Sequence, residues 1–434
     1  MLSTQEQEES PEVRTRNVSQ ERQPIGSKPR GHKTICIPID ETEYNEILDD
    51  PWAYRQSIDK VYAIHAELFP KAMGEGYTLH DKLPDSKKLS EIRLRRIKLK
   101  ADGEVYTIRP SFVLPYMSGF TDDVEKGLFL LSFGLPYWAI SYVFGKDDMY
   151  WQRVEVSLGR NSLVGTTVRT VEQLPKDVVS DEKHTYSNGD KSYIATTVGN
   201  ECVLGAAMSP SAGEADLTQA YGQFKSEARN LDPNYTPQTV NTDGWKATIN
   251  AWTTLFPTIT TILCFLHAFI KIRNCGKKLG ATYFELCTKV WTVYHTASES
   301  EFHAHLADLA IWALEHLPDG PTLNALLKLC LNFEAFALAY DFPSAHRTSN
   351  MVDRHMGLMD RYLFAGHYFH GHLMTAEYRI RAWALIHNFR PFCPRSQPYR
   401  DSFHSRAHRL NGFVYHQHWL HNLLISGSMA GFRA

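Results

Sequence analysis

The order of strand-like and helix-like segments after residue 178 constrains the fold of this chain more than any other feature. Three consecutive segments alternate apolar and polar residues with the period of two that is typical of β-strands; they are residues 178–188, 191–200 and 202–209. The pair Asn188-Gly189 between the first two favours a tight hairpin turn. A helical pattern follows at residues 214–231, and a strand at 236–245 leads into another helix. The sequence therefore predicts a β-β-β-α-β-α unit within an α/β fold.

This order of elements is that of the ribonuclease H-like fold, a mixed sheet flanked by helices. The chemistry of that fold requires carboxylates in the first strand, after the fourth strand and on a later helix. Two divalent ions held by such a set stabilise the attacking and leaving oxygens of a phosphodiester, and hard oxygen ligands suit Mg²⁺. Asp181, Asp243 and Asp353 stand in these three places. They are the predicted catalytic and metal-binding residues, with two Mg²⁺ ions, for which Mn²⁺ can substitute.

Each of these acids also has an ordinary structural interpretation. Asp243 stands before a helix, where an Asp commonly caps the backbone N–H groups of the first turn. Asp181 fits a solvent-facing strand position, and Asp353 can pair with the neighbouring Arg354 at the surface. The strand order and the spacing of the three acids together favour the catalytic interpretation. Three further acids remain alternatives for the third position: Asp360, Glu334 and Glu377.

Four short motifs lie at or near the three acids. They are DEKHTY (residues 181–186), NTDGW (241–245), CFLHAFIKIR (264–273) and HRTSNMVDRHM (346–356). In this order they resemble DDE-type transposases of insertion sequences, particularly the Mutator-like group, over residues 178–392. The resemblance implies a helical insertion before the third acid, and residues 276–340 show helical patterns throughout. The family usually has Glu as its third acid, whereas this chain has Asp353, as in DDD variants of the fold.

The resemblance also implies roles for residues around the acids. Cys264 and His267 match a Cys-x-x-His signature downstream of the second acid and are expected to support the site. Two such residues fall short of the four ligands of a structural zinc site. Arg347, Asn350 and Arg354 flank the third acid, and we expect them to contact DNA phosphates or to orient the acid.

Positive charge is local, because the net charge of the whole chain is only −2. Residues 87–100 are strongly basic, and five of them are predicted to contact phosphates: Arg93, Arg95, Arg96, Lys98 and Lys100. Residues 122–159 resemble a helix-turn-helix unit, whose third helix would present Tyr150, Gln152 and Arg153 to a major groove. A solvated surface and a plain three-helix bundle remain the alternatives.

These features together predict a transposase that binds the terminal inverted repeats of its element, nicks them and joins the 3′-hydroxyl to target DNA. Bringing two ends together implies a homodimer or a larger assembly on DNA. The resemblance to insertion-sequence enzymes implies a cytoplasmic protein associated with the bacterial nucleoid. Two alternatives remain: a ribonuclease H-like nuclease without strand transfer, and a decayed or domesticated protein that binds DNA without cleaving it.

The rest of the sequence bears on compartment and domain organisation. Seven scattered Cys without a CxxC pair favour a reduced intracellular protein. Two uncharged runs, residues 127–145 and 247–270, reach the length of a membrane span, but Gly, Pro and polar residues interrupt them, so no membrane partner is predicted.

The sequence predicts the following parts in order along the chain. The N-terminal parts are a disordered tail (1–35), a helical region (36–85) and a basic hairpin with helix-turn-helix-like domain (86–172). A catalytic domain in two pieces (173–275 and 345–392), separated by a helical insertion (276–344), and an Arg/His-rich C-terminal tail (393–434) follow.

Overall fold

The computed structural model describes residues 32–84, 86, 89 and 92–432. Of the tail predicted for residues 1–35, residues 1–31 lie outside the described part, whereas its end enters a strand, β1 (Thr34–Ile37). Lys87 and Lys88 of the basic segment also lie outside the described residues. The described chain is an α/β structure with two sheets and many helices, as the sequence predicts at this level.

A five-stranded sheet forms the centre of the molecule, with strand order β7-β6-β5-β8-β9. Its strands are β5 (Asp177–Ser187), β6 (Asp190–Gly199), β7 (Cys202–Ser209), β8 (Thr239–Thr242) and β9 (Thr260–Leu263). The first three are antiparallel, and β8 and β9 continue parallel to β5. Asn188 and Gly189 both have positive φ, 53° and 87°, which the tight β5–β6 hairpin requires. The predicted order β-β-β-α-β-α is confirmed, and β9 extends it.

Successive side chains of β5 point to opposite faces of the sheet, and a layer of helices covers each face. Val178 faces the layer of α7 (Glu214–Leu231) and α8 (Lys246–Leu255), where it is buried with Tyr221 and Trp252. Val179 faces the opposite layer, made chiefly by α14 (Asn350–Ala365) and α15 (Leu373–Phe389). The sheet is therefore covered on both faces, and residues two apart on β5 share one layer.

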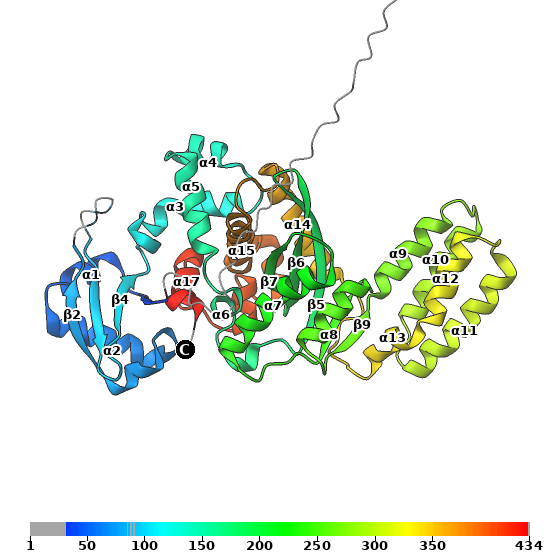
Figure 1. Ribbon diagram of the computed structural model, residues 1–434, viewed down its shortest axis with the longest axis horizontal. Helices are drawn as coiled ribbons and strands as arrows, with labels where there is room; N and C mark the ends of the chain where they lie inside the picture. The colour runs from blue at the N-terminus through cyan, green and yellow to red at the C-terminus, as the bar shows by residue number, and fades with distance from the viewer. Residues whose placement is uncertain (1–31, 85, 87–88, 90–91, 433–434) are drawn as a thin grey trace, which may run out of the picture.

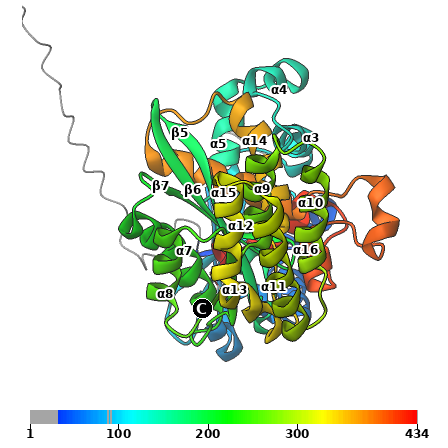
Figure 2. The same ribbon diagram turned by 90° about the vertical axis from the view of Figure 1, so that its right-hand side faces the viewer.

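The helical insertion forms a bundle with its own hydrophobic core. Its helices are α9 (Phe265–Gly276), α10 (Thr282–Tyr294), α11 (Glu299–His316), α12 (Pro321–Leu331) and α13 (Phe333–Ala337), followed by the 3₁₀ turn η5 (Leu338–Tyr340). The bundle extends from one end of the molecule (Figure 1) and is nearest the viewer in Figure 2. Its predicted start at residue 276 is wrong, because Phe265 and Ile272 of α9 are already buried in the bundle core.

A second, four-stranded sheet lies near the other end of the molecule, with strand order β1-β4-β3-β2. Its elements besides β1 are β2 (Tyr77–Lys82), β3 (Arg95–Leu99), β4 (Val105–Pro110), α1 (Glu41–Ile47) and α2 (Pro51–Ile64). The boundary predicted between residues 85 and 86 is wrong, because β2 pairs with β3 across it. The region predicted as helical also contributes two strands, β1 and β2.

Short helices connect this sheet to the central one. They are α3 (Thr121–Leu131), α4 (Tyr137–Phe144), α5 (Asp148–Leu158) and α6 (Leu163–Thr167), with the 3₁₀ turns η3 (Pro115–Met117) and η4 (Val171–Gln173). Two further 3₁₀ turns, η1 (Ala66–Leu68) and η2 (Lys71–Glu75), lie between α2 and β2. A buried carboxylate, Glu155 of α5, accepts a hydrogen bond of 2.8 Å from Tyr362 of α14 and lies 3.5 Å from the guanidinium of Arg379 on α15. Helix α5 is therefore fixed to the helices that cover the central sheet.

The C-terminal segment is part of the core and not a tail, which corrects the prediction for residues 393–434. It contains η6 (Pro394–Arg400), α16 (Arg406–Asn411), α17 (Trp419–Ser426) and η7 (Ser428–Gly431), and all of α17 is buried. Ser428 accepts a hydrogen bond from the N–H of Cys36 on β1 and donates one to the carbonyl of Leu68. The segment therefore joins the N-terminal sheet to the centre.

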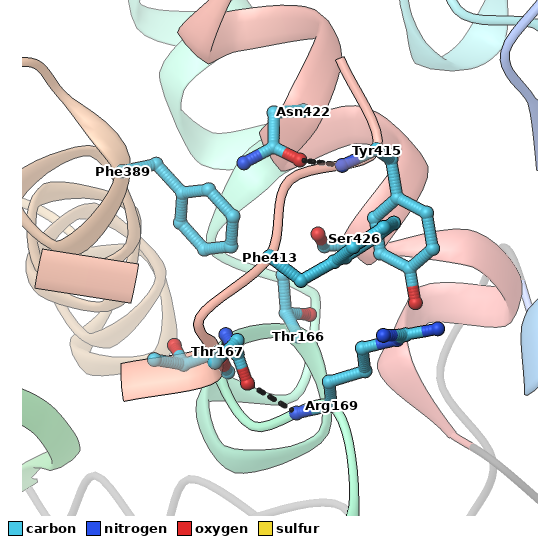
Figure 3. A pocket seen from close by; sticks show the side chains of 9 residues that line it. Thr166, Thr167, Arg169, Phe389, Phe413, Tyr415, Asn422 and Ser426 are labelled. Carbon is cyan, nitrogen blue, oxygen red and sulfur yellow. Dashed lines mark hydrogen bonds between the residues drawn. The ribbon is translucent and has the colours of Figure 1, made fainter. Parts of the chain in front are cut away.

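A small pocket lies where this segment meets the end of α6 (Figure 3). The N–H of Arg169 donates to Asn411 over 2.9 Å, and the N–H of Tyr415 donates to Asn422 over 2.9 Å. The guanidinium of Arg169 stacks 4.0 Å from the ring centre of Phe413. These contacts hold the chain before α17 against the connecting helices.

Among the described residues, no single helix is long and apolar enough to cross a membrane. One bent pair, Pro321–Leu331 with Phe333–Tyr340, passes by length and composition, and its apolar residues contribute to the bundle core. The uncharged run at residues 127–145 is divided between α3 and α4, and the run at 247–270 is divided among α8, β9 and α9.

Gly159, at the end of α5, provides a test of this packing. A Cβ atom built on Gly159 would lie 1.7 Å from the carbonyl oxygen of Tyr378 on α15. Gly159→Ala is therefore expected to lower the free energy of unfolding by about 1–3 kcal/mol, the usual cost of overpacking, measured by urea unfolding. The control Gly357→Ala, on an exposed position of α14 with no atom within 4 Å of the new Cβ, should instead stabilise by about 0.5–1 kcal/mol. Equal effects of the two substitutions would contradict the contact between α5 and α15.

Candidate active site

The register of the central sheet brings Asp181 and Asp243 side by side. Strands β5 and β8 are parallel neighbours, and Val179 pairs with Asn241. Two residues further along each chain, Asp181 lies within β5 and Asp243 directly follows β8. Neighbouring strands are about 4.8 Å apart, so the two carboxylates lie next to each other at the end of the sheet where β8 finishes. Asp243 also accepts a hydrogen bond of 2.8 Å from the N–H of Trp245, which stabilises the turn before α8. The helix-cap interpretation of Asp243 is wrong, because Trp245 is the N-cap residue of α8 and no side chain caps this helix.

The third predicted acid joins this edge from α14. Asp353 lies in the first turn of α14. A carboxylate oxygen of Asp353, a carboxylate oxygen of Asp181 and a ring nitrogen of His267 all lie within 4.8 Å of one another. Three elements distant in the sequence, β5, α9 and α14, therefore converge on one group that can hold a metal ion.

Cys264 and Ser349 position the residues around Asp353. The Sγ atom of Cys264, which is buried, accepts a hydrogen bond of 3.1 Å from the N–H of Ser349. The Oγ atom of Ser349 donates to Asp353 over 2.7 Å and lies 3.4 Å from Nδ1 of His267. Cys264 therefore anchors the start of α14, and Ser349 orients the carboxylate. The supporting role predicted for the Cys-x-x-His pair agrees with this geometry.

The electrostatics of the site reflect its concentration of negative charge. Burial, reinforced by the charges of Asp243 and Asp353, raises the pKa of Asp181 to about 6 against a hydrogen bond from the N–H of Glu182. A hydrogen bond with Cys264, together with the charges of Asp181 and Asp353, raises the pKa of His267 to about 9. The site therefore disfavours the negative charge of the Asp181 carboxylate and favours the positive charge of His267. A cation bound beside Asp181 would stabilise its ionised form.

Glu182 is a buried acid that the sequence analysis did not single out. It faces the opposite layer from Asp181, because successive strand residues alternate. Its carboxylate accepts hydrogen bonds of 2.7 Å from Tyr221 of α7 and Thr248 of α8, and burial raises its pKa to about 7. The available signal was its place next to Asp181 in a strand covered on both faces. Glu182 ties the two helices of that layer to β5.

The three alternatives for the third acid lie elsewhere. Asp360, further along α14, forms an ion pair of 2.6 Å with Lys183 of β5. Glu334 is exposed on α13 in the helical bundle. Glu377 of α15 accepts a hydrogen bond of 3.2 Å from the N–H of Met208 at the β7 edge of the sheet. Within the described part of the chain, Asp353 is the one of these four that shares a possible metal group with Asp181.

The residues predicted to contact DNA beside Asp353 divide into two kinds. Asn350 and Arg354 are exposed on the first turn and a half of α14. Arg347 instead lies among aromatic rings of the bundle: it donates a hydrogen bond of 2.8 Å to Tyr340 and stacks 4.9 Å from the ring centre of Tyr294. Its carbonyl also accepts a hydrogen bond from the N–H of Phe265. Arg347 therefore joins the bundle to α14, which gives it a structural role in place of the predicted phosphate contact.

The helix-turn-helix prediction places Tyr150, Gln152 and Arg153 on α5. Arg153 is exposed and lies 3.7 Å from Asp147, and Gln152 is partly exposed. The ring of Tyr150 is half-buried against Trp151, with ring centres 5.7 Å apart, so it contributes to packing. The surface of α5 that is free to contact another molecule is therefore centred on Arg153.

Strand β3 and the residues on either side of it carry the other predicted DNA contacts. Arg93, Lys98 and Lys100 are exposed. Arg95 donates a hydrogen bond of 3.0 Å to the carbonyl of Leu48, and Arg96 forms an ion pair with Asp81. Arg95 and Arg96 are therefore engaged within the N-terminal region.

No known protein-family model matches this chain, and no curated protein matches it. The function must therefore be inferred from the geometry of the site.

Proposed function

We propose that this chain is a DDE/DDD-type DNA transposase, which nicks the ends of its element by metal-dependent phosphodiester hydrolysis and joins the freed 3′-hydroxyl to target DNA. The observation that carries the proposal is that carboxylate oxygens of Asp181 and Asp353 lie within 4.8 Å of each other. Asp243 follows the neighbouring strand β8, and its charge helps to raise the pKa of Asp181. Carboxylates clustered in this way are costly unless a cation neutralises them.

The topology supports the same proposal. Three antiparallel strands followed by two parallel strands, in the order β7-β6-β5-β8-β9, agree with a ribonuclease H-like sheet. The acids occupy the first strand, the end of the fourth strand and a later helix, as that fold requires. The bundle α9–α13 lies between the second and third acids in the sequence, where the resembling transposases carry an insertion.

The chemistry of the donor set suits Mg²⁺ or Mn²⁺, since three carboxylates offer hard oxygen ligands. Two such ions, when bound, stabilise charge on the attacking and leaving oxygens of the phosphodiester. Asp181 and Asp243 present ligands from the rigid sheet, and Ser349 holds Asp353 toward them. His267, oriented by Ser349 and Cys264, lies beside the carboxylates of Asp181 and Asp353.

The partners follow from the reaction. The exposed groups beside the site, Asn350 and Arg354, are placed to contact the strand being cut, and the exposed residues of β3 and α5 supply more distant contacts. Such contacts to phosphate make binding strongly dependent on salt. Joining two element ends requires a homodimer or a larger assembly on DNA. In this proposal the protein acts on the DNA of a bacterial nucleoid.

Metal removal tests the proposal. The substrate is DNA carrying the sequences that flank the coding region, and the products are nicked and joined strands separated on a denaturing gel. Cleavage is expected with Mg²⁺ or Mn²⁺, should stop in EDTA and should return when Mg²⁺ is added in excess. Cleavage that persists in EDTA would contradict the proposal, as would the absence of cleavage with either ion.

The same gel separates the two other candidate functions. Nicking without joined products would indicate a ribonuclease H-like nuclease. Binding without cleavage would indicate a decayed DNA-binding protein, which the Asp in place of Glu at the third acid favours. The group formed by Asp353, Asp181 and His267 argues against decay, since the shorter side chain still reaches the site.

A further inference from the structure

A second group of potential metal ligands lies outside the acidic site. It consists of Asp122, in the first turn of α3, His418, directly before α17, and His421, within α17. One ligand atom from each of the three lies within 4.8 Å of the others. Helices α3 and α17 are in contact and lie between the N-terminal sheet and α15 (Figure 1). We call this group the histidine cluster.

Hydrogen bonds hold His421 in the orientation of a metal ligand. Its Nδ1 atom lies 3.0 Å from Oγ of Ser111, and its Nε2 atom lies 3.0 Å from a carboxylate oxygen of Asp122. In one tautomer, Nδ1 accepts from Ser111 and Nε2–H donates to Asp122. In the other, Nδ1–H donates to Ser111, so that the Nε2 lone pair faces the carboxylate and both can bind one cation. A ligand histidine is commonly fixed by a hydrogen bond from its other nitrogen in this way.

Hydrogen bonds among the described residues do not satisfy every ring nitrogen of the cluster, as His418 shows. Its Nδ1 atom is buried and has no hydrogen-bond partner among the described residues. Buried polar atoms without a partner are uncommon and destabilising. The ring centres of His418 and His421 are 5.1 Å apart, so both imidazoles border the same small space.

A third imidazole, that of His416, closes the cluster. Its ring stacks on His421 with the ring centres 4.6 Å apart. Its Nδ1 atom accepts a hydrogen bond of 2.9 Å from the backbone N–H of His418. The turn from His416 to His418 therefore brings two imidazoles next to His421 and the carboxylate of Asp122.

We propose that the histidine cluster binds one divalent transition-metal ion of the zinc class, with Asp122, His418 and His421 as protein ligands. Imidazole nitrogens with one carboxylate suit Zn²⁺ and neighbouring metals better than Mg²⁺. The remaining coordination position is open to water or to His416. The ion would tie the C-terminal segment to α3, and with Ser111 it would also fix the chain that follows β4. This role is independent of the acidic site and of the proposed transposase reaction.

Zinc binding by the full-length chain tests the proposal. All proteins carry Asp181→Asn, so that the acidic site does not contribute, and are stripped of metal before titration with Zn²⁺ alone in a calorimeter. The parent is expected to bind one ion, and Asp122→Asn and His418→Gln should each weaken binding by about ten-fold or more. Asp122 is exposed and His418 is partly exposed, so both variants are expected to fold.

Two matched variants serve as controls. Asp123→Asn changes the neighbouring exposed carboxylate of α3, and His370→Gln removes an exposed histidine outside the cluster. Both should bind Zn²⁺ as the parent does. Equal affinity in the parent, Asp122→Asn and His418→Gln would overturn the proposal.

The midpoint of thermal unfolding, measured with and without Zn²⁺, is a second test of binding at the histidine cluster. Ligands that bind the folded state raise the midpoint, so Zn²⁺ should raise that of the parent and of both controls. The increase should be lost in Asp122→Asn and His418→Gln. An increase of the same size in all five proteins would place the ion elsewhere and overturn the assignment.

Discussion

Asp181→Asn is expected to lower the rate of metal-dependent DNA cleavage by about two to three orders of magnitude, the scale seen when one group that stabilises developing charge is removed. Asn keeps the size and shape of the side chain but offers no charged ligand to a divalent ion. The fold should not suffer, because burial and the charges of Asp243 and Asp353 already oppose ionisation of Asp181. Initial cleavage rates at saturating Mg²⁺ measure the effect, and urea unfolding and DNA binding measure the retained fold.

Asp360→Asn is the matched control for this prediction. Asp360 lies on the same helix as Asp353, but its carboxylate pairs with Lys183 and is 55% exposed. Exposed ion pairs contribute little to stability, so the control should cleave DNA at nearly the rate of the unmodified chain. A control that loses as much activity as Asp181→Asn would make Asp360 the third acid. Full activity of Asp181→Asn would remove that residue from the site.

The sheet that carries the first two acids was predictable because its signals are local. Alternation with period two, the Asn188-Gly189 turn and the helical pattern at residues 214–231 each depend on neighbours in the sequence. The closeness of Asp181 and Asp243 depends on the register of two parallel strands, which the sequence does not reveal directly. In the structure, the parallel pairing of β5 with β8 provides that register.

The N-terminal sheet could not be predicted from local signals. The hairpin β3–β4 corresponds to the basic hairpin predicted within residues 86–172, and its two strands are close together in the sequence. Strand β1 runs parallel to β4 and pairs with it across α1 and α2, and β2 pairs with β3 across residues 83–94. Short strands that depend on such distant pairing resemble loops when the sequence is considered alone.

The burial of the C-terminal segment was not predicted, because the segment begins with a stretch rich in charged and polar residues. Arg and His dominate residues 393–418, which favoured a solvated tail, whereas the apolar residues of Trp419–Ser426 form a helix that is buried throughout. Arg390, at the end of α15 and just before this segment, is also enclosed: it is 4% exposed and donates to the carbonyl of Ser132 over 3.1 Å. Counting charges along the chain could not reveal partners so distant in sequence.

A buried ion pair between Arg381 of α15 and Glu227 of α7 likewise could not be predicted, because its two residues are far apart in the sequence. The two charged groups lie 2.5 Å apart, and both side chains are almost fully buried. Arg381 also donates to the carbonyls of Gly159 and Asn161, over 3.0 and 2.7 Å. Glu227 accepts a further hydrogen bond of 3.1 Å from the N–H of Val164 in α6. The pair therefore joins helices from both sides of the sheet to the chain between α5 and α6.

Arg381→Met is expected to lower the free energy of unfolding by about 3–5 kcal/mol, because it leaves Glu227 as a buried charge without its partner. Urea unfolding followed by tryptophan fluorescence measures the loss, since Trp383 is buried on the same helix. The control Arg361→Met, at an exposed position of α14, should change stability by no more than about 0.5 kcal/mol. The double variant Arg381→Met/Glu227→Gln should lose less than the sum of the two single losses, because the second change removes the charge that the first leaves unpaired. If Arg381→Met unfolds at the same urea concentration as Arg361→Met, the pair does not hold these helices together.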